Sequence, residues 1–364
     1  MITPDPGNHL PLTSEKATVG VLGGGAWGTA LAIHAARAGH AVLQWARDGA
    51  TVEAMNKDRE NPVYLPGIRL PPNLKATTDM RAVFDFCEMI LMVIPCQYAG
   101  EALQQAAEWI RPGHIIVSCS KGIVNTTLET LDEVFERILP PHTQLAYLSG
   151  PSFAKEVALD KPTCVTIASK SPETAARVQL LLSTPIFRCY RTTDVAGVEM
   201  GGAMKNVLAI ACGISDGLEY GANARAALIT RGLLEIARMA AARGANPLTM
   251  SGLAGMGDLV LTCTGDLSRN RTLGMRIGKG EKLRDILAST KSVVEGVVTS
   301  ASAHKLAEKL GLDCPVVRGI YKVLHEDKDP RQMVLETMSR ALKPEIEDDI
   351  TMAAAVSVGG SGHE

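Results

Sequence analysis

A glycine-rich turn between an apolar run and a helical pattern constrains this chain more than any other feature. Residues 23–28 read Gly-Gly-Gly-Ala-Trp-Gly, a G-x-G-x-x-G pattern, and they follow the apolar residues 19–22 directly. In this context Gly23 permits a tight turn, Gly25 lets a pyrophosphate approach the backbone, and Gly28 lets the helix pack closely on the strand. The free N–H groups at the helix start attract phosphates. The pattern therefore predicts a dinucleotide site.

The first half of the chain alternates short apolar runs with helical patterns. Runs typical of strands lie at 17–22, 41–47, 89–95, 114–120, 145–149, 164–169 and 187–191. Helical patterns lie at 28–38, 51–60, 98–110, 126–139 and 172–182, and a Pro-rich loop spans 61–73. Continuous apolar strands alternating with helices are typical of a parallel sheet covered on both faces. We therefore expect an α/β Rossmann domain, with a doubly wound, mostly parallel sheet, over residues 17–195.

The pattern changes after about residue 195, where helical spacing replaces the alternation. Apolar residues recur at helical intervals over 203–214, 224–242, 299–310, 315–324 and 331–342, with no convincing ladder of strands. An all-α domain over residues 196–345 is the simplest interpretation. Residues 1–16 and 346–364 are expected to form a flexible N-terminal extension and a flexible tail.

Composition bounds the class of protein and its partners. The 364 residues are 46% hydrophobic, which is enough to form two hydrophobic cores. Their net charge of −2 indicates no general attraction to nucleic acid or anionic membranes. The eight cysteines form no C-x-x-C pair or zinc spacing, which predicts reduced thiols and no metal site. We find neither a membrane-spanning run nor a signal peptide, and expect a cytoplasmic protein.

The end of the second predicted strand should contact the adenine ribose. An acid there binds the 2′-hydroxyl of NAD, whereas an arginine binds the 2′-phosphate of NADP. This strand ends in Arg47-Asp48, so both readings stay open, and Arg47 favours NADP weakly.

Polar residues also follow two later strands, at the edge where ligands of such sheets bind. Lys121 lies just after the strand at 114–120, and Gly150 and Ser152 follow the strand at 145–149. We expect all three to face the ligand crevice.

The second half supplies a candidate proton donor and an anion clamp. Lys205 lies inside an otherwise apolar helix, where burial lowers the pKa of an ammonium and allows proton exchange near neutral pH. Asp258 follows a Gly-rich turn and is placed to bind hydroxyls or orient Lys205. Ser268, Arg269 and Asn270 form a compact anion-binding group, because arginine grips phosphate bidentately. Glu295 precedes a helix and is also explained as a first-turn acid favoured by the helix dipole.

These pieces together resemble the bacterial-type NAD(P)-dependent glycerol-3-phosphate dehydrogenases. The matching segments are GGGAWGTALA, SKG, LSGPSFA, GAMKNVLAIACGISDGL, NARAALITRGL, GLAGMGDL, SRN and VVEGV. They occur in the family's order over roughly residues 18–340, so together they are far more specific than one glycine motif.

The resemblance implies reversible hydride transfer between NAD(P)H and dihydroxyacetone phosphate, giving sn-glycerol 3-phosphate for glycerophospholipid synthesis. Lys205 is similar to the family's catalytic proton donor and acceptor, and Lys121 to the lysine that contacts both cofactor and substrate. The other residues matching substrate contacts are Gly150, Ser152, Asp258, Ser268, Arg269 and Asn270. Cofactor contacts are matched by Ala26, Trp27, Arg47, Ala154, Arg269, Val293 and Glu295.

One alternative is another Rossmann-plus-helical dehydrogenase, acting on a 3-hydroxy acid or a sugar acid phosphate, because such enzymes also place a lysine early in the helical domain. A silent dinucleotide-binding module is a second alternative, and Lys121, Lys205, Asp258 and Arg269 argue against it. The apolar helices of the second half are compatible with a homodimer, and burial in a monomer core explains them equally well.

Overall fold

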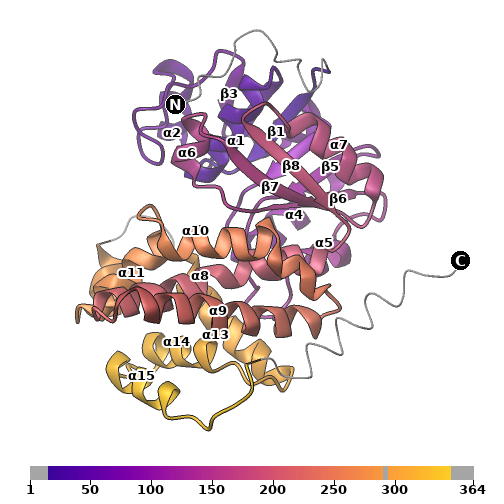
Figure 1. The fold of residues 1–364 in the computed structure, drawn as a ribbon. Coiled ribbons are helices and arrows are strands. Elements are labelled where there is room, and N and C mark those ends of the chain that lie inside the picture. Colours follow the sequence, from indigo (N-terminus) through magenta and orange to yellow (C-terminus); the bar gives the residue numbers. More distant parts are fainter. Residues whose placement is uncertain (1–14, 290–293, 346–364) are drawn as a thin grey trace, which may run out of the picture.

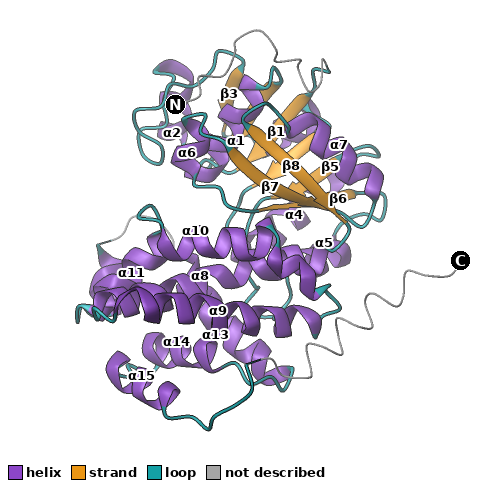
Figure 2. Ribbon diagram, in the orientation of Figure 1, coloured by secondary structure: helices purple, strands orange, loops and turns teal. Residues whose placement is uncertain are grey.

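The computed structural model describes residues 15–289 and 294–345 and shows two lobes (Figure 1). The upper lobe contains the sheet with helices around it, and the lower lobe contains only helices and loops (Figure 2). The expected order of an α/β Rossmann domain followed by a helical domain is confirmed. Residues 1–14 of the predicted extension and the predicted tail lie outside the described residues.

The described part of the chain forms one eight-stranded sheet with the order β3-β2-β1-β4-β5-β6-β7-β8. All neighbouring strands are parallel except β6 and β7, so the expected mostly parallel sheet is confirmed. The strands are β1 (Thr18–Leu22), β2 (Ala41–Trp45), β3 (Leu74–Thr77), β4 (Met89–Met92), β5 (Ile115–Ser118), β6 (Gln144–Ser149), β7 (Thr163–Ala168) and β8 (Phe187–Thr192). The strand order reverses between β1 and β4, which is where ligands bind such sheets.

Side-chain caps define several helix starts in the Rossmann domain. Asp48, Asp79 and Ser171 each accept a hydrogen bond from a backbone N–H of the helix that follows. The helices of this domain are α1 (Ala26–Arg37), α2 (Gly49–Lys57), α3 (Met80–Phe86), α4 (Cys96–Ala106), the 3₁₀ turn η1 (Ala107–Trp109), α5 (Leu131–Ile138), α6 (Ala154–Ala158) and α7 (Pro172–Leu182).

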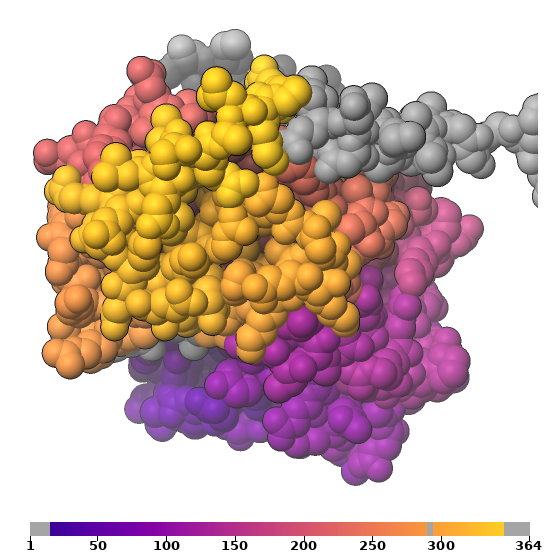
Figure 3. Space-filling model, turned by 90° about the horizontal axis from the view of Figure 1, so that it is seen from below, coloured from indigo at the N-terminus to yellow at the C-terminus, as the bar shows by residue number. Residues whose placement is uncertain are grey.

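Helix α8 (Val195–Gly217) is the centre of the helical domain. It is buried on nearly all sides, as expected for a helix that is apolar around its circumference. The helix is long and apolar enough to cross a membrane, but 94% of its most apolar 18-residue stretch is buried inside the protein. Figure 3 shows α13 to α15 covering the end of this domain away from the sheet. The other elements are α9 (Gly221–Ala241), η2 (Pro247–Ser251), the π-helical η3 (Leu253–Gly257), α10 (Asp258–Thr264), α11 (Arg269–Gly278), α12 (Leu283–Ala288), α13 (Glu295–Lys309), α14 (Pro315–His325) and α15 (Pro330–Met338).

The structure corrects several predicted elements. The helix expected over 126–139 begins only at Leu131, because Leu128 has a positive φ of 61° and a Thr130–Glu133 capping box starts the helix. Strand β3 and helix α3 were not predicted, since both are short and follow a Pro-rich loop. Helices α10 to α12 were also missed, because glycines and charged residues interrupt their apolar pattern.

Candidate active site

The glycine-rich turn lies between β1 and α1, and each glycine has its own reason to be there. Gly23 has a φ of +136°, and a Cβ on it would lie 2.8 Å from the Val93 carbonyl oxygen. A Cβ on Gly28 would lie 2.2 Å from the Gly23 oxygen, so this glycine lets the helix pack against the turn. A Cβ on Gly25, by contrast, would meet no protein atom within 4 Å. Protein packing does not require glycine at position 25, which fits a position left open for a ligand.

Two polar side chains that the sequence analysis missed hold this turn in place. Gln44 of β2 donates to the Gly23 oxygen at 2.8 Å. Asn61, from the Pro-rich loop, donates to the Gly24 oxygen at 2.9 Å and to Thr29 Oγ1 at 2.8 Å. These hydrogen bonds fix the turn through its carbonyl oxygens. The N–H groups at the start of α1 can then bind an anion. Both residues come from separate segments, and no local pattern marks them.

Trp27 links the turn to the loop after β5 that carries Lys121. Its Nε1 donates to the Cys119 carbonyl oxygen at 3.2 Å, two residues before Lys121. Ala26 is the first residue of α1 and is half-buried beside it. The dinucleotide turn and the Lys121 loop therefore share one edge of the sheet.

The Arg47-Asp48 pair at the end of β2 divides into two separate roles. Asp48 caps α2, accepting from Thr51 N at 2.8 Å and from Thr51 Oγ1 at 2.6 Å. These hydrogen bonds lower the pKa of Asp48. Arg47 is exposed, so its guanidinium is open to a ligand. The capping role gives Asp48 a structural function that needs no ribose.

Three charged side chains from both domains meet in one buried cluster. Lys121 Nζ donates to Asp258 Oδ2 at 2.6 Å, and Lys205 Nζ donates to Asp258 Oδ1. Asp258 is fully buried, and the two lysine side chains are only 12% and 11% exposed. Asp258 is the first residue of α10, directly after the π-helical η3, a form that is frequent at functional sites. The cluster joins the end of β5 to the centre of α8.

The burial of this cluster shifts its titration. Burial lowers the pKa of Lys205 to about 8, against the opposing attraction of Asp258. Burial alone would raise the pKa of Asp258, but the Lys121 and Lys205 ammonium groups outweigh it and lower that pKa. Lys205 therefore exchanges a proton near neutral pH, while Asp258 stays ionised between the two lysines.

Small residues on α8 bring the Rossmann domain close enough for this contact. A Cβ on Gly202 would lie 2.8 Å from Ser149 Oγ and 3.4 Å from Lys121 Cγ. Within the helical domain, a Cβ on Gly201 would lie 2.5 Å from the Ala254 oxygen. Gly150, just beyond Ser149, accepts from Lys121 Nζ at 3.3 Å and from Ser152 Oγ at 2.9 Å. Gly150 and Ser152 thus lie beside Lys121.

The predicted anion clamp lies at the start of α11 and is tied to α8. Ser268 is buried and caps α11, accepting from Arg271 N at 3.2 Å. Asn270 donates to Asn206 Oδ1 at 2.9 Å and accepts from Gly296 N at 3.0 Å. Asn206 directly follows Lys205, so the clamp and the candidate proton donor are fixed relative to each other. Asn206 was not predicted as a site residue.

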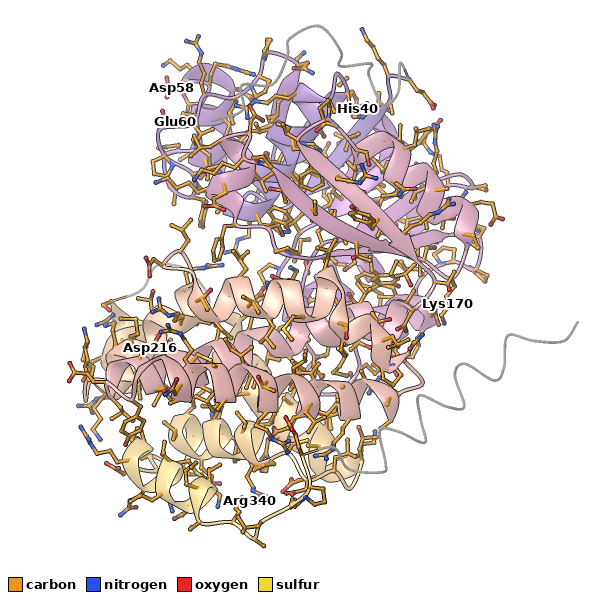
Figure 4. All side chains as sticks on the ribbon, in the orientation of Figure 1. His40, Asp58, Glu60, Lys170, Asp216 and Arg340 are labelled. Atoms are coloured by element: carbon orange, nitrogen blue, oxygen red, sulfur yellow. The ribbon has the colours of Figure 1, made fainter. Side chains whose placement is uncertain are left out.

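Arg269 and Arg271 are neighbours with different surroundings. Arg271 pairs with Asp216 at 2.8 Å, and Asp216 also pairs with Arg225 at 2.7 Å. Figure 4 labels Asp216 in the helical domain. Arg269 is exposed. Burial raises the pKa of Glu295 above its ordinary value, and the positive charges of Arg269, Lys205 and Lys121 oppose this shift. Arg269 and Glu295 therefore lie near the two lysines, whereas Arg271 stabilises the domain.

Of the two remaining predicted cofactor residues, the structure describes only one. Ala154 is the first residue of α6, half-buried, just after the Gly150 loop. Val293 lies outside the described residues. Among those residues, no group of three or more His, Cys, Asp or Glu side chains is arranged to hold a metal ion.

Comparisons with known proteins agree with this geometry in both halves of the chain. Residues 18–175 match the family described as "NAD-dependent glycerol-3-phosphate dehydrogenase N-terminus", and residues 194–335 match its "C-terminus" counterpart. This chain belongs to the NAD-dependent glycerol-3-phosphate dehydrogenase family. The two matches cover the dinucleotide turn and the Lys205–Asp258 cluster respectively.

Individual relatives of this dehydrogenase family align over nearly their whole length. A glycerol-3-phosphate dehydrogenase [NAD(P)+] from Geobacter sulfurreducens is 51% identical over 329 residues, covering 90% of this chain and 98% of the relative. The crystal structure of glycerol-3-phosphate dehydrogenase from Coxiella burnetii is 39% identical with a TM-score of 0.86, covering 89% and 99%. A Saccharomyces cerevisiae glycerol-3-phosphate dehydrogenase structure is 26% identical with a TM-score of 0.77, covering 90% and 100%.

Proposed function

We propose that this protein catalyses the reversible NAD(P)H-dependent reduction of dihydroxyacetone phosphate to sn-glycerol 3-phosphate, and so supplies glycerol 3-phosphate for glycerophospholipid synthesis. The observation that carries the proposal is the buried Lys121–Asp258–Lys205 cluster beside the dinucleotide turn. The membership of both halves in one dehydrogenase family supports it, and disfavours a dehydrogenase of 3-hydroxy acids or sugar acid phosphates.

Lys205 is the proposed proton donor. A nicotinamide held at this site would supply the hydride for the carbonyl carbon. The Lys205 ammonium gives its proton to the carbonyl oxygen, which becomes the hydroxyl of the product. Lys205 is then neutral and takes a proton back from solvent before the next reduction. Lys121 and the protonated Lys205 also stabilise the negative charge that develops on the oxygen. In the reverse direction, neutral Lys205 removes the hydroxyl proton.

The other predicted residues bind and orient the reactants. Ser268, Arg269 and Asn270 are the proposed phosphate clamp, with Gly150, Ser152 and Asp258 beside the reacting carbons. Binding energy from the phosphate, which does not itself react, fixes the orientation of the carbonyl. Gly23, Gly25, Ala26, Trp27 and Gly28 would hold the dinucleotide, together with Arg47, Lys121, Ala154, Arg269, Val293 and Glu295.

NADP is the proposed preferred cofactor. The Asp48 carboxylate is engaged in capping α2, while Arg47 is exposed at the end of β2. A guanidinium there favours the 2′-phosphate of NADP over a free 2′-hydroxyl.

The organisation of the chain follows from the same proposal. Residues 17–195 form the cofactor domain and 196–345 the catalytic helical domain, and the start of α8 at Val195 supports that boundary. We propose a cytoplasmic location, a small-molecule substrate with no nucleic-acid partner or membrane insertion, and a homodimer as a compatible assembly.

The test is absorbance at 340 nm with purified protein, dihydroxyacetone phosphate, and NADPH or NADH in parallel. Oxidation that requires the phosphorylated ketone, and is absent with unphosphorylated dihydroxyacetone, would support the substrate. A higher kcat/KM with NADPH would support the role of Arg47. No oxidation of either cofactor would refute the proposed reaction.

A further inference from the structure

One segment of the Rossmann domain is held at several points by the helical domain. It runs from Lys121, through the loop after β5, to Glu133 in the first turn of α5, and we name it the 121–133 segment. At its start Lys121 binds Asp258 of α10. Further along, the Ile123 oxygen accepts from Ser302 Oγ of α13 at 3.2 Å, and the Leu128 oxygen accepts from Arg243 Nη1 at 3.4 Å.

Glu199 of α8 holds the far end of this segment. Its Oε2 accepts from the backbone N–H of Leu131, the first residue of α5, at 3.2 Å. That N–H is one of the groups a helix start leaves without an intrahelical partner. Glu199 is only 7% exposed, so the contact is made away from bulk solvent. The contact therefore joins the catalytic helix to the start of α5.

Glu199 and the catalytic cluster lie along the same part of α8. Residues three apart on a helix share a face, so Glu199 lies one turn before Gly202. A Cβ on Gly202 would lie 3.4 Å from Lys121 Cγ, which places the Lys121 stem against this face. Lys205 lies one further turn along. The two ends of the 121–133 segment are thus attached to consecutive turns of the helix that carries Lys205.

We propose that Glu199 is a positioning residue for the reduction reaction: by binding the start of α5 to α8, it fixes the 121–133 segment and hence the place of Lys121 relative to Lys205. Its carboxyl group works as a hydrogen-bond acceptor for the Leu131 backbone N–H. Burial raises its pKa well above the ordinary value, and the nearby Asp132 raises it further. A glutamine at this position provides the same acceptor and no charge. The inference rests on the proposed function for its kinetic part only.

Glu235 offers a matched control inside the same protein. It is also a buried glutamate on a long helix, α9, and it accepts from the backbone N–H groups of Val316 at 2.8 Å and Val317 at 3.0 Å at the start of α14. Burial raises its pKa to about 7. It therefore repeats the capping contact of Glu199 at a helix that carries none of the cluster residues.

The experiment compares Glu199→Ala, Glu199→Gln and Glu235→Ala in the full-length protein. Hydrogen–deuterium exchange of the backbone amides is measured first, because it needs no turnover. We expect faster exchange over residues 121–133 in Glu199→Ala, wild-type exchange there in Glu199→Gln, and faster exchange only at the start of α14 in Glu235→Ala. Unchanged exchange over 121–133 in Glu199→Ala would overturn the anchoring role, whether or not the protein reduces dihydroxyacetone phosphate.

Steady-state kinetics with dihydroxyacetone phosphate and NADPH then measure the positioning effect. Small displacements of a reacting group cost up to about 100-fold in rate, so we expect kcat of Glu199→Ala to fall between about 10- and 100-fold. Glu199→Gln should stay within about threefold of wild type, with the same pH profile, and Glu235→Ala should keep its kcat. A similar loss of kcat in Glu199→Ala and Glu235→Ala would show a general stability effect and refute positioning, as would a Glu199→Gln variant as impaired as Glu199→Ala.

Discussion

The dinucleotide turn and the Lys121–Asp258–Lys205 cluster are built in different ways. The turn is made of backbone, from residues adjacent in sequence, and its glycines are set by local geometry and by close approach. The cluster is made of charged side chains on separate elements, with Lys121 and Asp258 137 residues apart. Its charges are buried and depend on one another, so removal of one leaves the others without compensation. The effect of a substitution in the turn should therefore depend on the space around the new side chain. In the cluster it should depend on whether the charge is kept.

The largest effect is expected at the cluster. Lys205→Met keeps the apolar stem in place and removes the proton donor, so kcat for dihydroxyacetone phosphate should fall about 10²- to 10⁴-fold. The dissociation constant of NADPH, measured by fluorescence titration, should change little, because the dinucleotide turn is untouched. Lys279→Met, at an exposed lysine of the helical domain, is the control. A kcat within tenfold of wild type would remove Lys205 from its role.

The turn allows a sharper contrast between two glycines. Gly28→Ala places a methyl group against the Gly23 carbonyl and should lower the thermal midpoint of unfolding. Gly25→Ala meets no protein atom, and its backbone is extended with φ −72° and ψ 178°, so the midpoint should stay near wild type. Dinucleotide affinity should nevertheless fall about tenfold or more in Gly25→Ala, since the methyl group occupies the approach to the pyrophosphate. Wild-type affinity in that variant would separate Gly25 from cofactor binding.

A smaller effect is expected at Arg47, just after β2. Arg47→Gln should raise the KM for NADPH about tenfold, because a charge-assisted hydrogen bond to the 2′-phosphate is lost, and should leave the KM for NADH nearly unchanged. The loss should shrink at high salt, since Arg47 is exposed. Equal changes for both cofactors would contradict the proposed preference.

The difference between a turn of adjacent residues and a cluster of distant ones also explains what was predictable from the sequence. The turn was predictable because Gly23, Gly25 and Gly28 are adjacent to one another and lie between a strand and a helix. Lys205 was predictable as a lysine in an apolar helix, but its partner was not decided, since Asp258 was also considered for substrate hydroxyls. Gln44 and Asn61 could not be predicted as turn supports, because they reach it through folding of distant segments. The late start of α5 depends on a single backbone conformation at Leu128.

The pH dependence of kcat/KM tests the account of the cluster most directly. Burial lowers the pKa of Lys205 to about 8, so below that pH the lysine is protonated and can donate, and above it the donor is lost. With NADPH saturating and dihydroxyacetone phosphate well below its KM, kcat/KM should be level at lower pH and fall about tenfold per pH unit above roughly 8. Oxidation of glycerol 3-phosphate should rise through the same pH, because it needs the neutral amine. A reduction rate that stays level up to pH 10 would contradict Lys205 as the proton donor.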